Sequence, residues 1–208
     1  PWEAIKPQEV RAGFFSLSGD PLAIAGERAT MCLFGRGDLA SGDAGAIAVE
    51  RESGSFSVTT TRTAGGFSES GVIQAGALVA EGDKGPTVIW ASSLDGQPVA
   101  TSKRILLSHL TDVQDEGLTY LEKTRQTQLT WGKLPHLMRR GVAEVELTVG
   151  AGAYFVYALS GDGERRFTVP STKVGNTLRF TADIGADPAE ATYLYEIVHP
   201  RGAAFIYR

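Results

Sequence analysis

The sequence has almost no cysteine and no long apolar run. Cys32 is the only cysteine among the 208 residues, so an internal disulfide cannot form and a zinc site built on several cysteine ligands is excluded. No apolar run reaches the roughly 20 residues that a membrane-spanning helix needs. These absences argue against a disulfide-stapled scaffold and against membrane insertion.

Positive charge is also scarce. The chain has 20 Lys and Arg against 24 Asp and Glu, a formal net charge of -4, and its basic residues form no block. Nucleic-acid binding needs a basic patch or stripe, so nucleic acid is not an expected partner. The hydrophobic share of 42% is ordinary for a folded globular protein, and a chain of this composition can bury a core.

The histidines show no metal-binding pattern. His109, His136 and His199 are far apart in the sequence and lack the short spacing that places two imidazoles on one metal ion. We therefore expect no metal site and no cofactor.

The carboxylates show no catalytic pattern either. Glycosidases need two carboxylates flanking one bond, and sequence spacing places no such pair, so no catalytic residue is predicted within this chain. Glu144 and Glu146 lie two apart in an expected strand and are predicted to form an outward polar face. Glu196, in the last expected strand, is predicted to be partly buried, with Arg139 or Arg140 as its partner.

One helix is expected near the N-terminus. Asp20 suits the N-cap and Pro21 the first helical position, and Gly35 or Gly37 is suited to end the helix. Residues 1–40 are thus predicted to be an N-terminal segment with one helix. Its apolar stripe would comprise Leu22, Ala25, Ala29, Cys32 and Leu33.

From residue 46 onward the pattern changes to short runs rich in β-branched and aromatic residues, separated by Gly, Asp, Asn and Ser. This is typical of antiparallel strands joined by tight turns. Turn pairs are expected at Gly82-Asp83, Asp95-Gly96 and Asp162-Gly163. Strands are predicted over 46–50, 55–60, 72–80, 86–92 and 103–109, then over 142–149, 153–159, 164–169, 177–183 and 192–198.

The stretch from 111 to 140 is polar and lacks period-two alternation. The predicted fold class is therefore mainly β, made of antiparallel β-sandwich units. Residues 41–112 would form the first β-sandwich unit, 113–140 a linker or crossover, and 141–208 a second, immunoglobulin-like unit.

Three stretches are informative together. They are SGDPLAIAGERATMCLFGRGDLA, VIWASSLDGQPVATSKRILLSHLTDVQDEG, and the run that begins WGKLPHLMRRGVAEVELTV, continues through YALSGDGERRFTVP and LRFTADI, and ends with TYLYEIV. In that order they resemble the C-terminal region of large bacterial glycoside hydrolases with a (β/α)8 catalytic barrel. In such enzymes this region carries non-catalytic β-sandwich domains.

The resemblance implies that residues 20–34 are the last helix of the barrel. The catalytic residues would then lie upstream, so the expected partner is a catalytic barrel domain or chain, and an enzymatic role for this chain alone stays open. The sequence leaves the location open, with export to the periplasm or the medium as one expectation.

An alternative interpretation is an independent carbohydrate-binding module that recognises a polysaccharide through exposed aromatic rings. The candidate carbohydrate-binding residues are Trp131, Tyr154 and Tyr120. Trp131 stands out because it follows a polar segment and precedes Gly132, where a ring either pins a loop by packing or meets a ligand.

Overall fold

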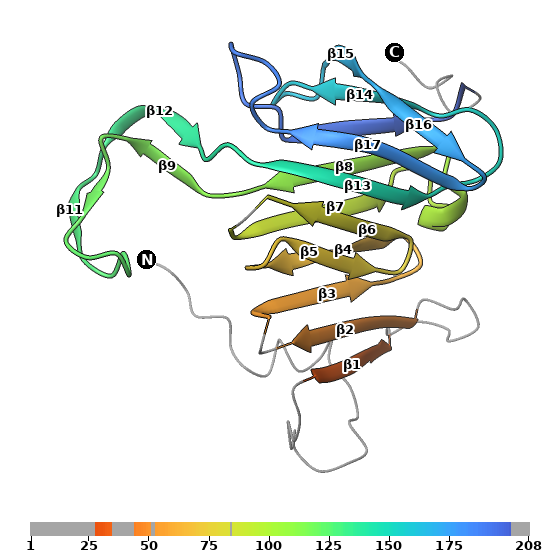
Figure 1. Ribbon diagram of the computed structural model, residues 1–208, viewed down its shortest axis with the longest axis horizontal. Helices are drawn as coiled ribbons and strands as arrows, with labels where there is room; N and C mark the ends of the chain where they lie inside the picture. Colours follow the sequence, from red (N-terminus) through yellow and green to blue (C-terminus); the bar gives the residue numbers. More distant parts are fainter. Residues whose placement is uncertain (1–27, 35–43, 51–52, 84, 201–208) are drawn as a thin grey trace.

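The computed structural model describes residues 28–34, 44–50, 53–83 and 85–200. They form an antiparallel, mainly β fold with two facing sheets and a projecting hairpin (Figure 1). The larger sheet contains, in spatial order, β1 (Arg28–Phe34), β2 (Ala44–Glu50), β3 (Ser55–Thr59), β4 (Thr63–Ser68), β7 (Thr87–Ser93), β8 (Arg104–Leu110), β18 (Leu194–Val198), β14 (Phe155–Leu159) and β15 (Arg165–Val169).

The smaller sheet contains, in spatial order, β16 (Ser171–Val174), β17 (Thr177–Asp183), β13 (Val142–Thr148), β6 (Leu78–Gly82) and β5 (Val72–Ala75). A short 3-10 turn, η2 (Val99–Thr101), lies in the connection between β7 and β8. The mainly β fold class predicted from the sequence is confirmed.

The core lies between the two sheets. Along β13, buried Val145 and Leu147 alternate with Glu144 and Glu146, because successive side chains of a strand face opposite sides. Both glutamates make cross-strand contacts with β17, Glu144 with Thr181 and Glu146 with Arg179. The predicted outward polar face of β13 is therefore confirmed.

The structure corrects the division into two β units. β8 pairs with β18 in the larger sheet, and β6 pairs with β13 in the smaller one. Strands from 41–112 and 141–208 thus share both sheets and one hydrophobic core. The error arose because local alternation identifies strands and carries no information on which distant strand each one meets.

The predicted helix is also corrected in part. Residues 28–34 form β1, which pairs with β2 along its whole length. Seven residues paired in register outweigh an apolar stripe at helical spacing, since tertiary context overrides weak intrinsic propensity. Residues 20–27 of the expected helix, and its expected end at Gly35 or Gly37, lie outside the described residues.

The expected turns have mixed outcomes. Asp95-Gly96 joins the paired strands β7 and β8, and Asp162-Gly163 joins β14 and β15, with positive φ at both glycines. By contrast, Gly82-Asp83 leads from the smaller sheet into the larger one and closes no hairpin. The predicted strand 72–80 divides into β5 and β6 at Gly76, whose φ is 51°.

A fully buried histidine, His109, joins the sheets. Its Nδ1 lies 3.1 Å from the carbonyl oxygen of Ala182 and its Nε2 lies 3.1 Å from the hydroxyl of Thr87. A carbonyl only accepts, so Nδ1–H donates to it and Nε2 accepts from Thr87. Burial lowers the pKa of His109 below 6.5, and the bond to Ala182 opposes this only in part. The ring is therefore neutral in the folded protein.

We expect stability to fall on acidification through His109. The unfolded chain takes up the proton near pH 6.5, whereas the folded chain does so only at lower pH. The stability that neutral His109 contributes is present above the unfolded pKa and is lost below it, by up to about 1.4 kcal/mol per pH unit. Urea unfolding at pH values on both sides of 6.5 checks this. The plot of unfolding free energy against pH should have a smaller slope for the His109→Gln variant than for the unsubstituted protein. Equal slopes for the two proteins would contradict it.

Candidate docking surface

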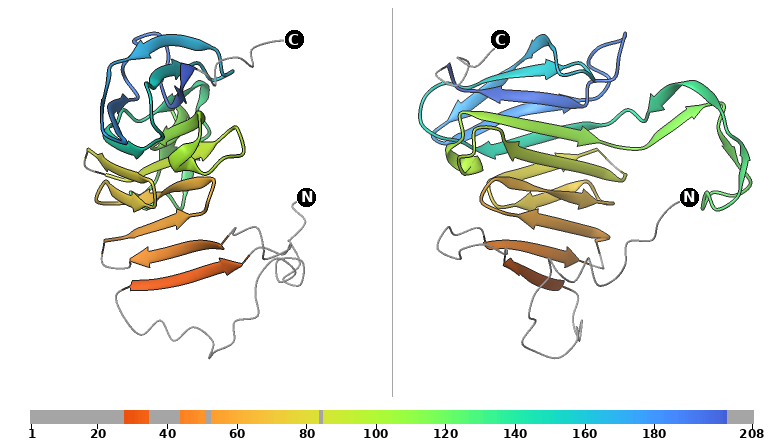
Figure 2. Two further views of the ribbon diagram at one scale, coloured as in Figure 1. Left: turned by 90° about the vertical axis from the view of Figure 1, so that its right-hand side faces the viewer. Right: turned by 180° about the vertical axis from the view of Figure 1, so that it is seen from behind.

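Residues 113–138 form a projecting hairpin, here called the arm. It corrects the predicted linker or crossover. Its strands are β9 (Val113–Glu116), β10 (Thr119–Tyr120), β11 (Gln128–Thr130) and β12 (Lys133–Met138). β9 pairs with β12 and β10 pairs with β11. Figures 1 and 2 show the arm extending away from the sandwich between β8 and β13.

The arm is exposed on both faces and is rich in large apolar side chains. Every residue from 123 to 137 is exposed. The exposed fraction is 81% for Trp131, and the other large apolar side chains exposed on the arm are Val113, Leu121, Leu129, Leu134 and Leu137. An isolated two-stranded hairpin is marginally stable in water, and large apolar side chains exposed together on one element are typical of an interaction site. The arm therefore has the character of a docking element.

Several polar and charged groups of the arm have partners on the arm or next to it. Arg125 pairs with Asp112, Lys133 lies 3.6 Å from Glu116, and His136 Nδ1 lies 2.5 Å from Asp115. The hydrogen bond from Arg125 holds the pKa of Asp112 below its usual value. With most of its polar groups bonded to neighbours, the arm offers mainly its apolar side chains to a partner.

A groove of about 770 Å³ lies where the base of the arm meets the loop 184–193. Most of its wall is apolar, and it continues the exposed surface of the arm. The apolar lining consists of Val113, Pro135, Leu137 and Met138 from the arm and of Ile184, Pro188, Ala189, Ala191 and Tyr193 from the loop.

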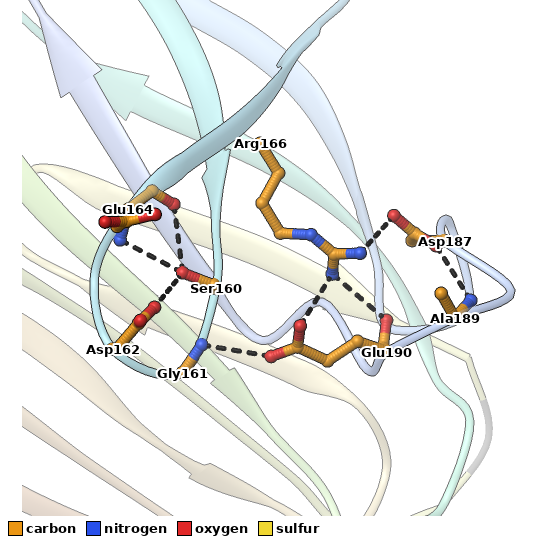
Figure 3. Close-up of polar contacts among 8 residues, drawn as sticks. All are labelled: Ser160, Gly161, Asp162, Glu164, Arg166, Asp187, Ala189 and Glu190. Carbon is orange, nitrogen blue, oxygen red and sulfur yellow. Dashed lines mark hydrogen bonds and ion pairs between the residues drawn. The ribbon is translucent and has the colours of Figure 1, made fainter.

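The loop wall is held in place by Arg166 (Figure 3). Its guanidinium pairs with Asp187 and lies 3.4 Å from the carboxylate of Glu190. Glu190 in turn accepts a hydrogen bond from the backbone N–H of Gly161 at 3.1 Å. Asp187 accepts one from the N–H of Ala189 at 2.8 Å. These bonds connect the loop to the β14–β15 turn, so this wall of the groove is preformed.

The three predicted carbohydrate-binding residues lie in two different places. Trp131 and Tyr120 are on the arm, where the guanidinium of Arg125 lies 5.7 Å from the centre of the Tyr120 ring. Tyr154 is 7% exposed and lies in the core, with its hydroxyl donating to the carbonyl of Ser102 at 2.9 Å. The Tyr154 ring thus packs in the core and presents no open face to a sugar.

The leucines of the arm were not identified from the sequence. Leu121, Leu129 and Leu134 stand singly in a polar stretch, so they give no alternation. Their isolation is the sequence feature that indicates a docking surface. A large apolar residue surrounded by polar ones, on a strand that covers no core, has no intramolecular partner to pack against.

The expected burial of Glu196 is confirmed, and its expected partners are wrong. The residue is 4% exposed, and each of its carboxylate oxygens lies 2.6 Å from an arginine, Arg104 on one side and Arg165 on the other. Burial alone would raise the pKa of Glu196, but the hydrogen bonds from Arg165 and Arg104 lower it overall. An ionised, doubly paired carboxylate is unsuited to the role of general acid.

The two predicted partners make other bonds. Arg139 donates to the carbonyl of Pro86 at 2.5 Å, and Arg140 lies 3.1 Å from Asp183. Within the part of the chain that the structure describes, no group of three or more potential metal ligands occurs, and no helix is long and apolar enough to cross a membrane.

The comparisons with known proteins returned nothing: no protein-family model matches the chain, and neither a curated protein nor a solved structure matches it.

Proposed function

We propose that this chain is a non-catalytic accessory β-sandwich region of a glycoside hydrolase, and that it docks on the catalytic (β/α)8 barrel. The observation that carries the proposal is the apolar arm. Trp131 and its neighbouring leucines are exposed on a hairpin that packs on no core, and interface hot spots are enriched in tryptophan. The preformed groove at the base of the arm extends the same surface.

The choice of a barrel as the partner rests on the resemblance of three sequence stretches to glycoside hydrolase C-terminal regions. The second stretch ends within the first half of the arm, and the third begins at Trp131. Trp131, Leu134 and Leu137 of the arm therefore lie inside the segments that carry the resemblance, whereas Leu121 and Leu129 lie between two of these segments.

Substitution of Trp131 by Ala should weaken barrel binding by about thirtyfold or more, because truncating a central buried tryptophan costs about 2 kcal/mol or more. The measurement is calorimetric titration of the folded chain into a bacterial catalytic barrel prepared without its own C-terminal region. Leu134→Ser should weaken binding less, since the side chain is smaller.

The matched control is Val174→Ser. Val174 and Leu134 are both 71% exposed, but Val174 lies in β16 and not on the arm, so its substitution should leave binding unchanged. The same samples are titrated with neutral polysaccharides. Polysaccharide binding that Trp131→Ala abolishes, together with no barrel binding, would reject the docking function in favour of the carbohydrate-binding alternative.

A further inference from the structure

The two sheets differ in length, and the difference leaves a step in the sandwich. The smaller sheet ends at β5, whereas the larger sheet continues past it through β3, β2 and β1. Figure 2 shows β1 and β2 extending as a single layer below the level at which the smaller sheet ends. Within the described residues, β5 pairs only with β6, so its other edge is open.

A pocket of about 250 Å³ lies at this step. Val72, Ile73 and Gln74, three consecutive residues of β5, line it. β3 also contributes three consecutive residues, Ser55, Phe56 and Ser57, so the pocket lies between β5 and the facing strand β3 of the larger sheet.

The floor of the pocket belongs to the inner face of the larger sheet. Ala48 lies opposite Ser57, Ser57 opposite Gly66, and Gly66 opposite the core residue Ile89. Directly opposed residues of an antiparallel pair point to the same face, so Ala48 and Ser57 continue the core-facing surface beyond the end of the smaller sheet. Their side chains are small, and the stacked rings of Phe56 and Phe67 also line the pocket.

The open edge of β5 is protected by its short length alone. Edge strands are normally blunted by short length, charged residues, proline or a bulge, and β5 has four residues without charge, proline or a register shift. Of the other edges, β16 has Lys173, and β15 has Arg165 with a register shift where it pairs with β14. β5 reads Val-Ile-Gln-Ala, and no charged residue lines the adjoining pocket.

We propose that the β5 edge binds one extended, uncharged segment of a partner polypeptide by strand addition. The segment would pair its backbone with β5 and cover Ala48 and Ser57 with small side chains, as in recognition by β-augmentation. A second copy of the folded chain does not fit. Antiparallel edge-to-edge pairing of two smaller sheets would place both larger sheets on the same side, where β2 and β1 of each copy would collide. A single strand avoids this collision.

The test uses the full chain and, as probe, a short acetylated and amidated peptide of alternating threonine and valine. Binding is followed by calorimetry and by amide exchange. The expected result is saturable binding that protects the amides of residues 72–75, whereas the same peptide with alternate backbone nitrogens methylated does not bind, because it cannot donate to the edge.

Two variants of the chain locate the site. Val72→Lys places a charge on the edge and should weaken peptide binding by at least about tenfold. Val79→Lys is the matched control, since Val79 is 41% exposed against 45% for Val72 but lies on β6, which is paired on both sides. Ala48→Phe fills the floor and should weaken binding as strongly.

Three outcomes would overturn the proposal. The first is a folded chain that binds neither peptide, and the second is equal binding of the methylated peptide. The third is strong protection of the amides of residues 72–75 in the free chain beyond that given by pairing with β6, which would mean that the edge is already occupied. None of these outcomes bears on the arm, so this site and the proposed docking surface are tested separately.

Discussion

Replacing Leu147 by Ala is expected to lower the free energy of unfolding by about 2 to 5 kcal/mol, the range for removing a fully buried leucine side chain. Leu147 lies in β13 at the centre of the smaller sheet and is fully buried against the larger one. Because residues 41–112 and 141–208 share one core, the loss should appear in a single cooperative transition. Urea unfolding followed by far-UV circular dichroism, with calorimetry, measures it.

The companion variant is Leu107→Ala, in β8 of the larger sheet and in the other half of the sequence. Leu107 is also fully buried. Its substitution should shift the same transition and lower the free energy of unfolding by a similar amount. Val174→Ala, at an exposed site of β16, should change the free energy of unfolding by no more than about 0.5 kcal/mol. Two separate transitions, each shifted by only one of the leucine variants, would contradict the single sandwich and restore the division into two units.

Much of the strand content could be predicted because half-buried strands alternate. β13 and β17 follow the alternation residue by residue, and the predicted boundaries lie close to the observed ones. β4 was missed because its sequence is rich in glycine. An added Cβ at Gly65 would lie 2.6 Å from the carbonyl oxygen of Ile89, so close packing of β4 on its neighbours requires glycine where a β-former is usually expected.

The arm could not be predicted as a strand pair for the opposite reason. Alternation arises when one face of a strand is buried, and residues 123–137 are exposed on both faces. A polar stretch without alternation therefore predicts a linker. Trp131 was identified as a candidate from its sequence context, but only the structure shows that it lies with Leu129 and Leu134 on one projecting hairpin.

The ion pairs of Glu196 also could not be predicted from local sequence pattern. Its strand predicted partial burial, but the choice of partner depended on pairings that are distant in the sequence. Arg104 is 92 residues away and Arg165 is 31 residues away. Arg104 lies beside Glu196 because β8 pairs with β18, and Arg165 reaches the same carboxylate from β15, across the intervening strand β14.

Substitution of Glu196 by Ala is expected to lower the free energy of unfolding by about 3 kcal/mol. The change removes two charge-assisted hydrogen bonds and leaves Arg104 and Arg165 without their shared carboxylate. The arginine side chains are 38% and 31% exposed, so water compensates part of the loss and the effect should stay below that of a fully buried pair. Arg104→Ala and Arg165→Ala should each cost less, because the remaining arginine still pairs with Glu196.

The pH dependence of stability separates the charge of Glu196 from its packing. Its pKa is lowered in the folded protein, so its contribution is present above the unfolded value of 4.5 and is lost as the pH falls through the folded pKa. Glu196→Gln keeps the shape and removes the charge. The difference in unfolding free energy between the unsubstituted protein and this variant should be largest near neutral pH and shrink below pH 4.5. A difference that stays constant down to pH 3, or grows on acidification, would show that packing, and not the paired charge, holds β18 between β8 and β14.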